Sequence, residues 1–535
     1  MTPTTTTWCF LAFTFYGIRT ILRRIFSTLE TVPGPASKSI ITGNLSQFHD
    51  LDDWGFQQEL EENYGRVVKV HGFLGDRHLF VFDPVALHHI LVKDQDVYEE
   101  MPKFICLDLL IFGRGIFSTM RDDHRKYRKT MMPAFSTLNL REMVPLFYEV
   151  AERARDGLIA PDISQGPRTL DFNSILCRTS LELIGRTGIG YSFDPMLPGQ
   201  EQTDRYARAL RALFVTAFKL QLFIPLLPIL MKSLPSALRR FLINFIPSQP
   251  LHELRDLVDL TDSTAAQLVK DRKMVQESGK LDGDEEGKDI MSLLVKGNAV
   301  ADAGMHLADD ELVACLSMIL FAATDTTSSS MNRMIHLLAL NPEVQRKLRE
   351  EVLAAPEHLD YDTIDALPYL DGFVREILRL YPPVPVMFRE AMSDATLPLS
   401  KPITGSDGTI MHTIAVPKGT SVYVGIAAAN HDKSIWGEDA LEFKPDRWTK
   451  GKADSVETKL PGIYGNTMTF LGGGRSCIGF KFAQLEMKVV ACVLLRSFSF
   501  SKPDSGIRWR KTGIMPSPYV NDEPKLPIVV ERLRA

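Results

Sequence analysis

A glycine-rich loop near the carboxyl end carries the cysteine in which this chain concentrates its chemistry. The loop covers residues 470–479, FLGGGRSCIG, and Cys477 stands at its exit. Three consecutive glycines let a backbone turn tightly and approach a flat ligand closely. Apolar residues at helical spacing over residues 482–493 predict a helix with one buried face, whose amino end points back at Cys477. The helix dipole and free amides at that end favour a thiolate.

The loop also fits the pattern F-x-x-G-x-R-x-C-x-G. A lone cysteine is ordinarily a small buried apolar residue, but these five fixed positions coincide by chance only about once in ten million start sites. The chain therefore resembles the cytochrome P450 family, in which such a cysteine is the axial thiolate ligand of heme iron. The resemblance implies heme b as cofactor, Cys477 as its metal ligand, Arg475 paired with a heme propionate, and Phe470 shielding the sulfur.

A second motif lies in the longest helical pattern, Leu307 to Leu340, which ends before a proline and spans about 50 Å. Asp325 and Thr326 interrupt its apolar middle, where polar groups are costly to bury without partners or a function. Hydroxyls bonded back to the preceding turn are the plain interpretation. The resemblance implies that Thr326 stabilises dioxygen and Asp325 helps to deliver protons. Ala323 replaces the family's usual glycine, so the local helix geometry is expected to differ.

Further basic residues resemble heme-propionate ligands. His124 and Arg128 lie one turn apart in a helix predicted over residues 121–135. The family has W-x-x-x-R here, and His124 in the tryptophan position retains a hydrogen-bond donor. Arg389 resembles another propionate-binding arginine.

Glu376 and Arg379 lie three residues apart in a predicted helix that ends at two prolines. Such a pair in isolation is usually an ion pair on the surface. Its apolar neighbours and the family's E-x-x-R motif instead favour a buried structural pair, with Arg447 of a second arginine motif as its partner.

Composition limits the remaining possibilities. The 535 residues are 45% hydrophobic, with a formal charge of −5 and a pI near 6.2, and give no sign of a nucleic-acid partner. Six cysteines without paired spacing argue against a disulfide framework and a zinc module, and indicate a reducing compartment.

The amino terminus predicts a membrane anchor with a basic flank over residues 1–30, followed by a catalytic domain over residues 31–535. Its apolar run, Trp8 to Ile18, reaches a marginal span only with weakly polar neighbours. Arginines follow the run, which places that end in the cytoplasm and argues against a cleaved signal peptide. We expect a single endoplasmic-reticulum anchor with a cytoplasmic catalytic domain; an interfacial segment is the alternative.

Two surface features are predicted. An apolar, proline-broken segment from Leu220 to Met231 is either a set of buried helix ends or a lid that touches the membrane and admits apolar substrates. A basic patch that docks an acidic reductase is the other feature, with surface lysines and arginines as the plain alternative: Arg125, Lys126, Lys129, Lys481 and Lys488.

Taken together, the motifs predict a mainly α fold with small β-sheets, the cytochrome P450 fold, with one large heme domain after the anchor. The implied function is a heme-thiolate monooxygenase that uses dioxygen and electrons from an NADPH-cytochrome P450 reductase. The expected substrate is an apolar small molecule, for which a terpenoid of fungal secondary metabolism is the guess. A dioxygen-independent isomerase or dehydratase on the same fold and a noncatalytic heme-binding protein are the alternatives.

Overall fold

A computed structural model describes residues 27–52, 54–200, 204–221, 223–277, 288–302, 304–449, 456–503, 506–512 and 515–533. Most of the predicted anchor lies outside these residues. The chain divides into two compact units. Unit 1 comprises residues up to Met101, with 386–430 and 458–475, and unit 2 comprises residues 102–385, 431–457 and 476–535.

Unit 1 is built on a five-stranded sheet in the order β1-β2-β8-β5-β3. Only β2 and β8 pair in parallel, and the other neighbours are antiparallel. The strands are β1 Val67–His71, β2 Arg77–Val81, β3 Tyr98–Glu99, β5 Val386–Ala391 and β8 Ser421–Gly425.

A hairpin and three short α-helices also belong to this unit: β6 Ala395–Thr404, β7 Ile410–Val416, α2 Leu45–Phe48, α3 Gly55–Asn63 and α4 Pro84–His88. Asp83 caps α4, because its Oδ1 accepts from the backbone N–H groups of Val85 and Ala86. The same carboxylate accepts from the Ser400 amide and so ties the helix to the hairpin.

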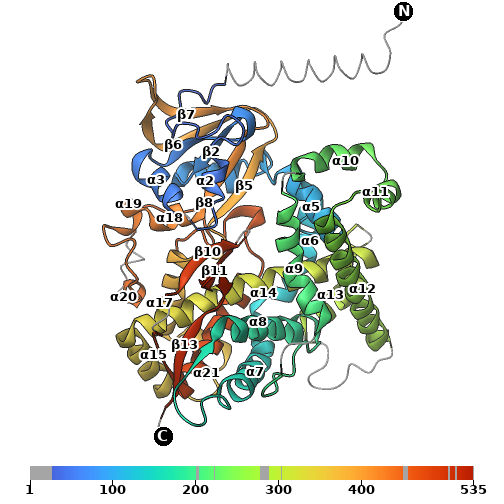
Figure 1. Ribbon diagram of the computed structural model, residues 1–535, viewed down its shortest axis with the longest axis vertical. Coiled ribbons are helices and arrows are strands. Elements are labelled where there is room, and N and C mark those ends of the chain that lie inside the picture. Colours follow the sequence, from blue (N-terminus) through green and yellow to red (C-terminus); the bar gives the residue numbers. More distant parts are fainter. Residues whose placement is uncertain are drawn as a thin grey trace, which may run out of the picture. The chain divides into compact units, whose positions relative to one another are not determined.

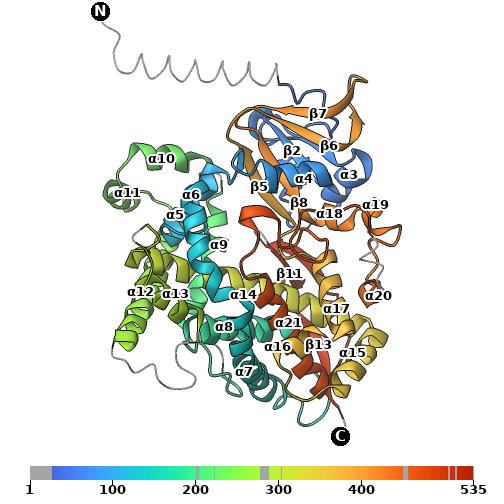
Figure 2. The same cartoon turned by 180° about the vertical axis from the view of Figure 1, so that it is seen from behind.

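Unit 2 is mainly helical (Figures 1 and 2). Its longer helices are α5 Pro102–Phe112, α6 Arg121–Met131, α7 Thr137–Ala154, α8 Phe172–Ile189, α9 Arg205–Lys219, α12 Gln249–Glu277, α13 Ile290–Ala299, α14 Asp309–Leu340, α15 Pro342–Ala354, α17 Pro368–Leu380 and α21 Phe480–Ser497. Its shorter helices are α10 Leu227–Ser233, α11 Ser236–Ile243, α16 Tyr361–Asp365, α19 Lys433–Trp436 and α20 Asp446–Thr449.

Helix α18, Ile426–His431, runs from unit 1 into unit 2. Unit 2 also has two small antiparallel sheets. One has the order β4-β13-β9, with β4 Arg168–Asp171, β9 Phe498–Ser501 and β13 Pro527–Arg532. The other has the order β10-β11-β12, with β10 Arg508–Thr512, β11 Met515–Val520 and β12 Glu523–Pro524. The predicted fold class, mainly α with small sheets, is confirmed.

Helix α14 is the core helix of unit 2. It begins where the Glu311 carboxylate accepts from the Ala308 N–H, and it ends before Pro342, which cannot continue its hydrogen bonds. Helix α8 runs beside it, and the Asn332 amide donates to Asn173 across this contact. In the described part of the chain, α14 is the one unbroken helix that is long and apolar enough to cross a membrane, but most of it is buried in protein. This burial identifies it as a core helix.

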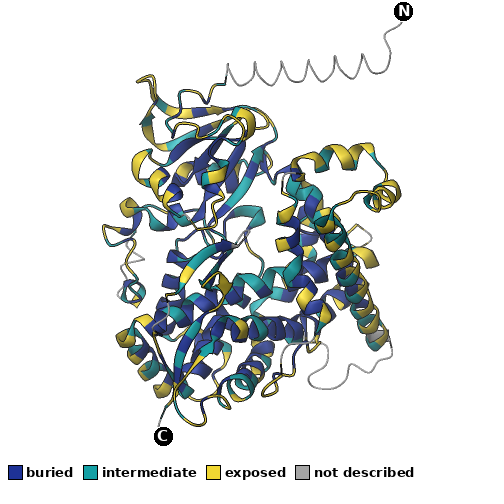
Figure 3. Cartoon of the chain, viewed as in Figure 1, coloured by how far each residue is buried: buried dark blue, intermediate teal, exposed yellow. Residues whose placement is uncertain are grey.

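Helix α21 is more deeply buried than the sequence predicts. The apolar spacing predicts one buried face, but every residue from Gln484 to Leu495 is buried (Figure 3). Two charged residues, Glu486 and Lys488, lie within that stretch. The prediction of a single buried face is wrong because α21 is surrounded by neighbouring elements of unit 2. The spacing of apolar residues cannot predict that charged residues such as these are buried as well.

Helices α10 and α11 have the opposite character, because their apolar residues lie on the surface (Figure 3). Large exposed side chains continue from the turn before α10 to the residues after α11: Phe223, Leu226, Ile229, Leu230, Leu238, Phe241, Leu242, Phe245 and Ile246. We call this set the apolar α10–α11 surface. The interpretation of this segment as buried helix ends is wrong. Ile224, which the sequence places in the same run, is buried.

Candidate functional site

Cys477 combines two properties that rarely occur together. Burial raises the pKa of its thiol, while the Gly479 backbone N–H and the Arg128 charge act to lower it. Yet the side chain is exposed. The sulfur is therefore accessible to a ligand. A cysteine sulfur that binds a metal does so as the thiolate, which a metal cation stabilises.

Arg128 holds the segment that carries Cys477. Its guanidinium donates to the carbonyl oxygen of Ser476 and, at 2.9 Å, to the Ser476 hydroxyl. Burial lowers the pKa of this guanidinium, and Cys477 raises it. Arg128 therefore fixes the backbone directly before the cysteine. His124, one turn earlier on α6, is buried.

The glycines of the loop are required by the protein's own backbone. Gly473 has a φ of +71°, and a Cβ there would lie 1.8 Å from the Leu91 carbonyl oxygen. A Cβ at Gly472 would lie 2.0 Å from the carbonyl oxygen of Pro461. These contacts account for two of the three glycines without a ligand. The expectation that the glycines serve close approach to a flat ligand has no support at these positions.

Two arginines from the motifs lie in unit 1, and each is paired with an acid that sequence reasoning missed. Arg475 donates to one carboxylate oxygen of Glu99 through Nε at 3.2 Å and Nη2 at 3.0 Å. Arg389 Nη1 lies 2.7 Å from the Glu100 carboxylate. The available signal was an acidic pair directly after an aromatic residue.

Arg389 retains one unused donor. Its side chain is 2% exposed, and its Nη2 is buried without a hydrogen-bond partner among the residues that the structure describes. Buried nitrogen atoms of this kind are rare because an unmade bond costs about 1–3 kcal/mol. A carboxylate ligand would satisfy it. The exposed Cys477 thiol of unit 2 is suited to bind a metal, and this donor of unit 1 is suited to bind a carboxylate; heme carries both kinds of group.

Phe470 also lies in unit 1. It is nearly buried, and its ring packs edge to face on Tyr464 with 5.8 Å between ring centroids. This contact fixes the ring, while its expected role of shielding the sulfur stays a prediction.

Asp325 and Thr326 lie in the middle of α14. Burial raises the pKa of Asp325 to about 6, and Arg211 of α9 acts to lower it. Thr326 donates its hydroxyl hydrogen to the Ala322 carbonyl oxygen at 2.7 Å. The plain interpretation of a hydroxyl bonded to the preceding turn therefore describes this structure. The oxygen of that hydroxyl keeps its lone pairs to accept a further hydrogen bond.

Arg211 has no motif that would have identified it. Its position follows from aromatic packing one turn away on each helix, where Phe214 of α9 stacks on Phe321 of α14 with centroids 4.3 Å apart. Phe112 of α5 contacts both rings.

A further buried acid is Glu486 of α21. It is fully buried, and its carboxyl group faces the hydroxyls of Ser180 and Thr327. Burial raises its pKa well above the ordinary value.

Glu376, Arg379 and Arg447 meet inside unit 2. Arg379 donates to both Glu376 oxygens at 2.9 Å, and Arg447 Nε lies 3.5 Å from one of them. The Trp448 indole and the Lys444 backbone N–H donate to the same carboxylate. Glu376 and Arg379 have no exposed surface. This cluster joins α17 to the segment around α20 and does not include Cys477.

The predicted docking patch needs one correction. Lys488 is 1% exposed, and its ammonium group lies 2.7 Å from Asp365 and 2.8 Å from Asp371. It is therefore a buried structural residue that joins α21 to α16 and α17. Arg125 and Lys129 are exposed, as a docking surface requires, although Arg125 pairs with Asp122.

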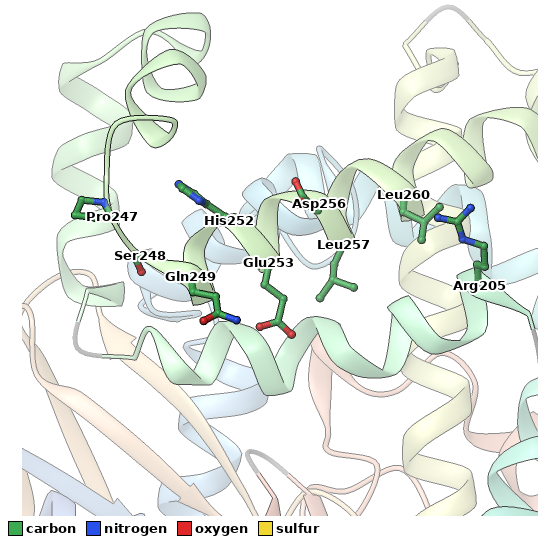
Figure 4. Close-up of a pocket in the computed structure, with 9 residues that line it drawn as sticks. All are labelled: Arg205, Pro247, Ser248, Gln249, His252, Glu253, Asp256, Leu257 and Leu260. Carbon is green, nitrogen blue, oxygen red and sulfur yellow. The ribbon is translucent and has the colours of Figure 1, made fainter.

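A cavity of about 730 Å³ lies elsewhere in unit 2 (Figure 4). It opens along α12 opposite α9, and its lining includes Arg205, His252, Glu253 and Asp256. None of the candidate catalytic or heme-binding residues lines it.

Comparisons with known proteins agree with the motifs. The family model described as cytochrome P450 matches residues 33–518. Cytochrome P450 monooxygenase 91 of Postia placenta is 43% identical over 527 residues, which cover 97% of each chain. Ganoderic acid synthetase of Ganoderma lucidum is 36% identical and covers 91% of each chain. The cytochrome P450 enzyme eriI of Hericium erinaceus is 34% identical over 95% of this chain and 94% of its own.

Proposed function

Because this chain belongs to the cytochrome P450 family and is a monooxygenase, we propose that it oxidises a terpenoid of fungal secondary metabolism. The ganoderic acid synthetase among its relatives supports this substrate class, since its name assigns it to the formation of a terpenoid acid. Electrons reach the enzyme from an NADPH-cytochrome P450 reductase. The protein is held at the endoplasmic-reticulum membrane by residues 1–30, with the catalytic part in the cytoplasm.

Heme b is the cofactor, and the observation that carries its assignment is the exposed thiol of Cys477 at the exit of the glycine-rich loop. Cys477 would hold the iron, and Arg389 Nη2 would donate a hydrogen bond to a propionate. Arg475, His124 and Arg128 complete the propionate side. Bound in this way, the heme supplies dioxygen activation, which the protein's own side chains cannot perform.

The protein's own residues position the Cys477 sulfur and handle protons. Arg128 holds the Ser476 backbone and so limits the movement of the Cys477 sulfur. Asp325, with a pKa of about 6, is mostly ionised at neutral pH but exchanges a proton readily. The Thr326 hydroxyl oxygen is oriented by its bond to Ala322 and accepts a hydrogen bond from water or substrate. Asp325 and Thr326 therefore form the proton-handling pair.

The first test is the carbon monoxide difference spectrum of reduced membranes that contain the full chain. We expect the red-shifted Soret band of thiolate-ligated heme, and its loss in Cys477→Ala. Reconstitution with a reductase and a panel of terpenoids then tests the substrate class, with fatty acids and sterols as comparison substrates. A heme-loaded wild-type protein without the shifted band would remove the thiolate assignment.

A further inference from the structure

Four charged side chains of unit 1 form one compact cluster, and only two of them belong to family motifs. Glu99 and Glu100 face Arg475 and Arg389 respectively, at 3.0 Å and 2.7 Å between nitrogen and oxygen. Glu99 is 3% exposed and Arg389 is 2% exposed. We call these four residues the Glu–Arg cluster. Its two carboxylates and two guanidinium groups sum to zero formal charge.

The sheet of unit 1 builds this cluster. Strand β3 pairs with β5 so that Tyr98 lies opposite Ala391, and Glu99 lies opposite Glu390. Glu100 follows the end of β3 and therefore comes beside Arg389 of β5. Both acids are thus carried by backbone that a sheet holds in register, which gives their carboxylates little freedom to move.

The four charges act on one another. Burial lowers the pKa of the Arg389 guanidinium, and Glu100 raises it. Arg475 lowers the same pKa further, while Glu99 raises it. A buried Arg389 and a partly buried Arg475 would repel each other where the local dielectric constant is low. The two acids therefore stabilise both arginines in place.

The two acids do not use every hydrogen-bond donor of Arg389. Arg389 Nη1 donates to Glu100 and to the Phe388 carbonyl oxygen, while Nη2 is buried and has no partner in the described part of the chain. A carboxylate that reaches Arg389 thus finds one directed donor on a guanidinium whose charge is already compensated. Binding of a carboxylate by Arg389 therefore depends more on the direction of this hydrogen bond than on the attraction between opposite charges.

We propose that Glu99 and Glu100 are positioning residues for the heme, which hold the Arg475 and Arg389 guanidinium groups in place and cancel their charge before the propionates bind. This inference rests on the proposed heme site. It predicts that the two acids set the electrostatic potential at the cofactor. Reduction adds an electron to the heme, and nearby carboxylates oppose that step.

The test of the charge effect uses the heme-loaded full chain with Glu99→Gln, Glu100→Gln and the double substitution. Glutamine keeps an oxygen that accepts the arginine's hydrogen bond but removes the negative charge. We expect the ferric-to-ferrous midpoint potential to shift upward in each single variant and further in the double variant. The matched control is Glu59→Gln, which removes an exposed carboxylate on α3 of the same unit and should leave the potential unchanged.

The test of positioning compares Glu100→Ala with Glu100→Gln. Alanine removes the acceptor and frees a buried guanidinium, so we expect heme transfer to apomyoglobin to become at least about fivefold faster, while Glu100→Gln stays near the wild-type rate.

Glutamine variants whose potential matches that of Glu59→Gln, or a Glu100→Ala variant that retains heme as the wild type does, would overturn this inference. Both measurements are made only after the wild-type protein has shown the thiolate band. Absence of that band would instead remove the proposed heme site itself.

Discussion

At the residue scale, Asp325 shows how its surroundings adapt an ordinary carboxyl group to a task. Burial raises its pKa to about 6, and Arg211 limits the rise. Cys177 of α8 is a further titratable group near Asp325, and burial raises the pKa of that thiol to about 11. Asp325 therefore titrates close to neutral pH, where a group that passes protons works best.

This environment has a measurable effect on stability. A folded-state pKa above the unfolded value means that the wild type loses stability as pH rises through about 4 to 6. Asp325→Asn has no charge to bury and should be more stable than the wild type above pH 6. With about 1.4 kcal/mol for each pKa unit, the gain is at most about 3 kcal/mol. Urea unfolding at pH 4 and at pH 7.5 checks this prediction, and a gain of equal size at both values would contradict it.

At the element scale, the Glu376 cluster binds the carboxyl half of α17 to the segment that includes α20. Glu376 accepts hydrogen bonds from Arg379, Trp448 and the Lys444 backbone. Arg379 also donates to the Ala440 carbonyl oxygen at 2.7 Å. One buried carboxylate thus joins segments about seventy residues apart in sequence.

Glu376→Gln keeps the size of the side chain but leaves the buried Arg379 charge without its anion. Breaking a buried ion pair from one side costs about 3–5 kcal/mol, so we expect a strongly destabilised protein with poor heme incorporation. The measurement is the urea midpoint, with Glu343→Gln as control, because Glu343 pairs with Arg346 on the exposed surface of α15. A midpoint close to that of the control would show that the other cluster residues compensate for the lost charge.

The sequence predicted these elements unequally, for physical reasons. Helix α14 was predictable because a long apolar pattern ends at a proline, and Cys477 because its loop is a specific motif. Lys488 was misplaced because sequence shows charge and not burial, and its partners Asp365 and Asp371 lie more than a hundred residues away. Glu99 and Arg211 depend on contacts between distant segments, which periodicity does not record.

At the scale of the whole molecule, each unit contributes a different part of the proposed chemistry. Unit 1 carries Arg389, Phe470 and Arg475, while unit 2 carries Cys477 and the α14 pair. The division falls between Arg475 and Ser476, inside the cysteine loop. Unit 2 also carries the apolar α10–α11 surface, which is larger than scattered apolar residues would explain.

We expect the apolar α10–α11 surface to touch the membrane from which apolar substrates enter. In protein that lacks residues 1–30, the triple substitution of Phe223, Phe241 and Phe245 by serine should weaken binding to phospholipid vesicles at least about tenfold, because each ring loses favourable burial. Ile224 is unsuitable for this test, since it is buried and its substitution would damage the core.

Leu138→Ser with Leu353→Ser provides the control, because both leucines are exposed on other helices of unit 2. Vesicle co-sedimentation measures the binding. If the control weakened binding as much as the triple variant, general surface hydrophobicity would explain the attachment. If the triple variant bound like the parent protein, another surface would have to make the contact, and the apolar side chains of α10 and α11 would need a protein partner instead.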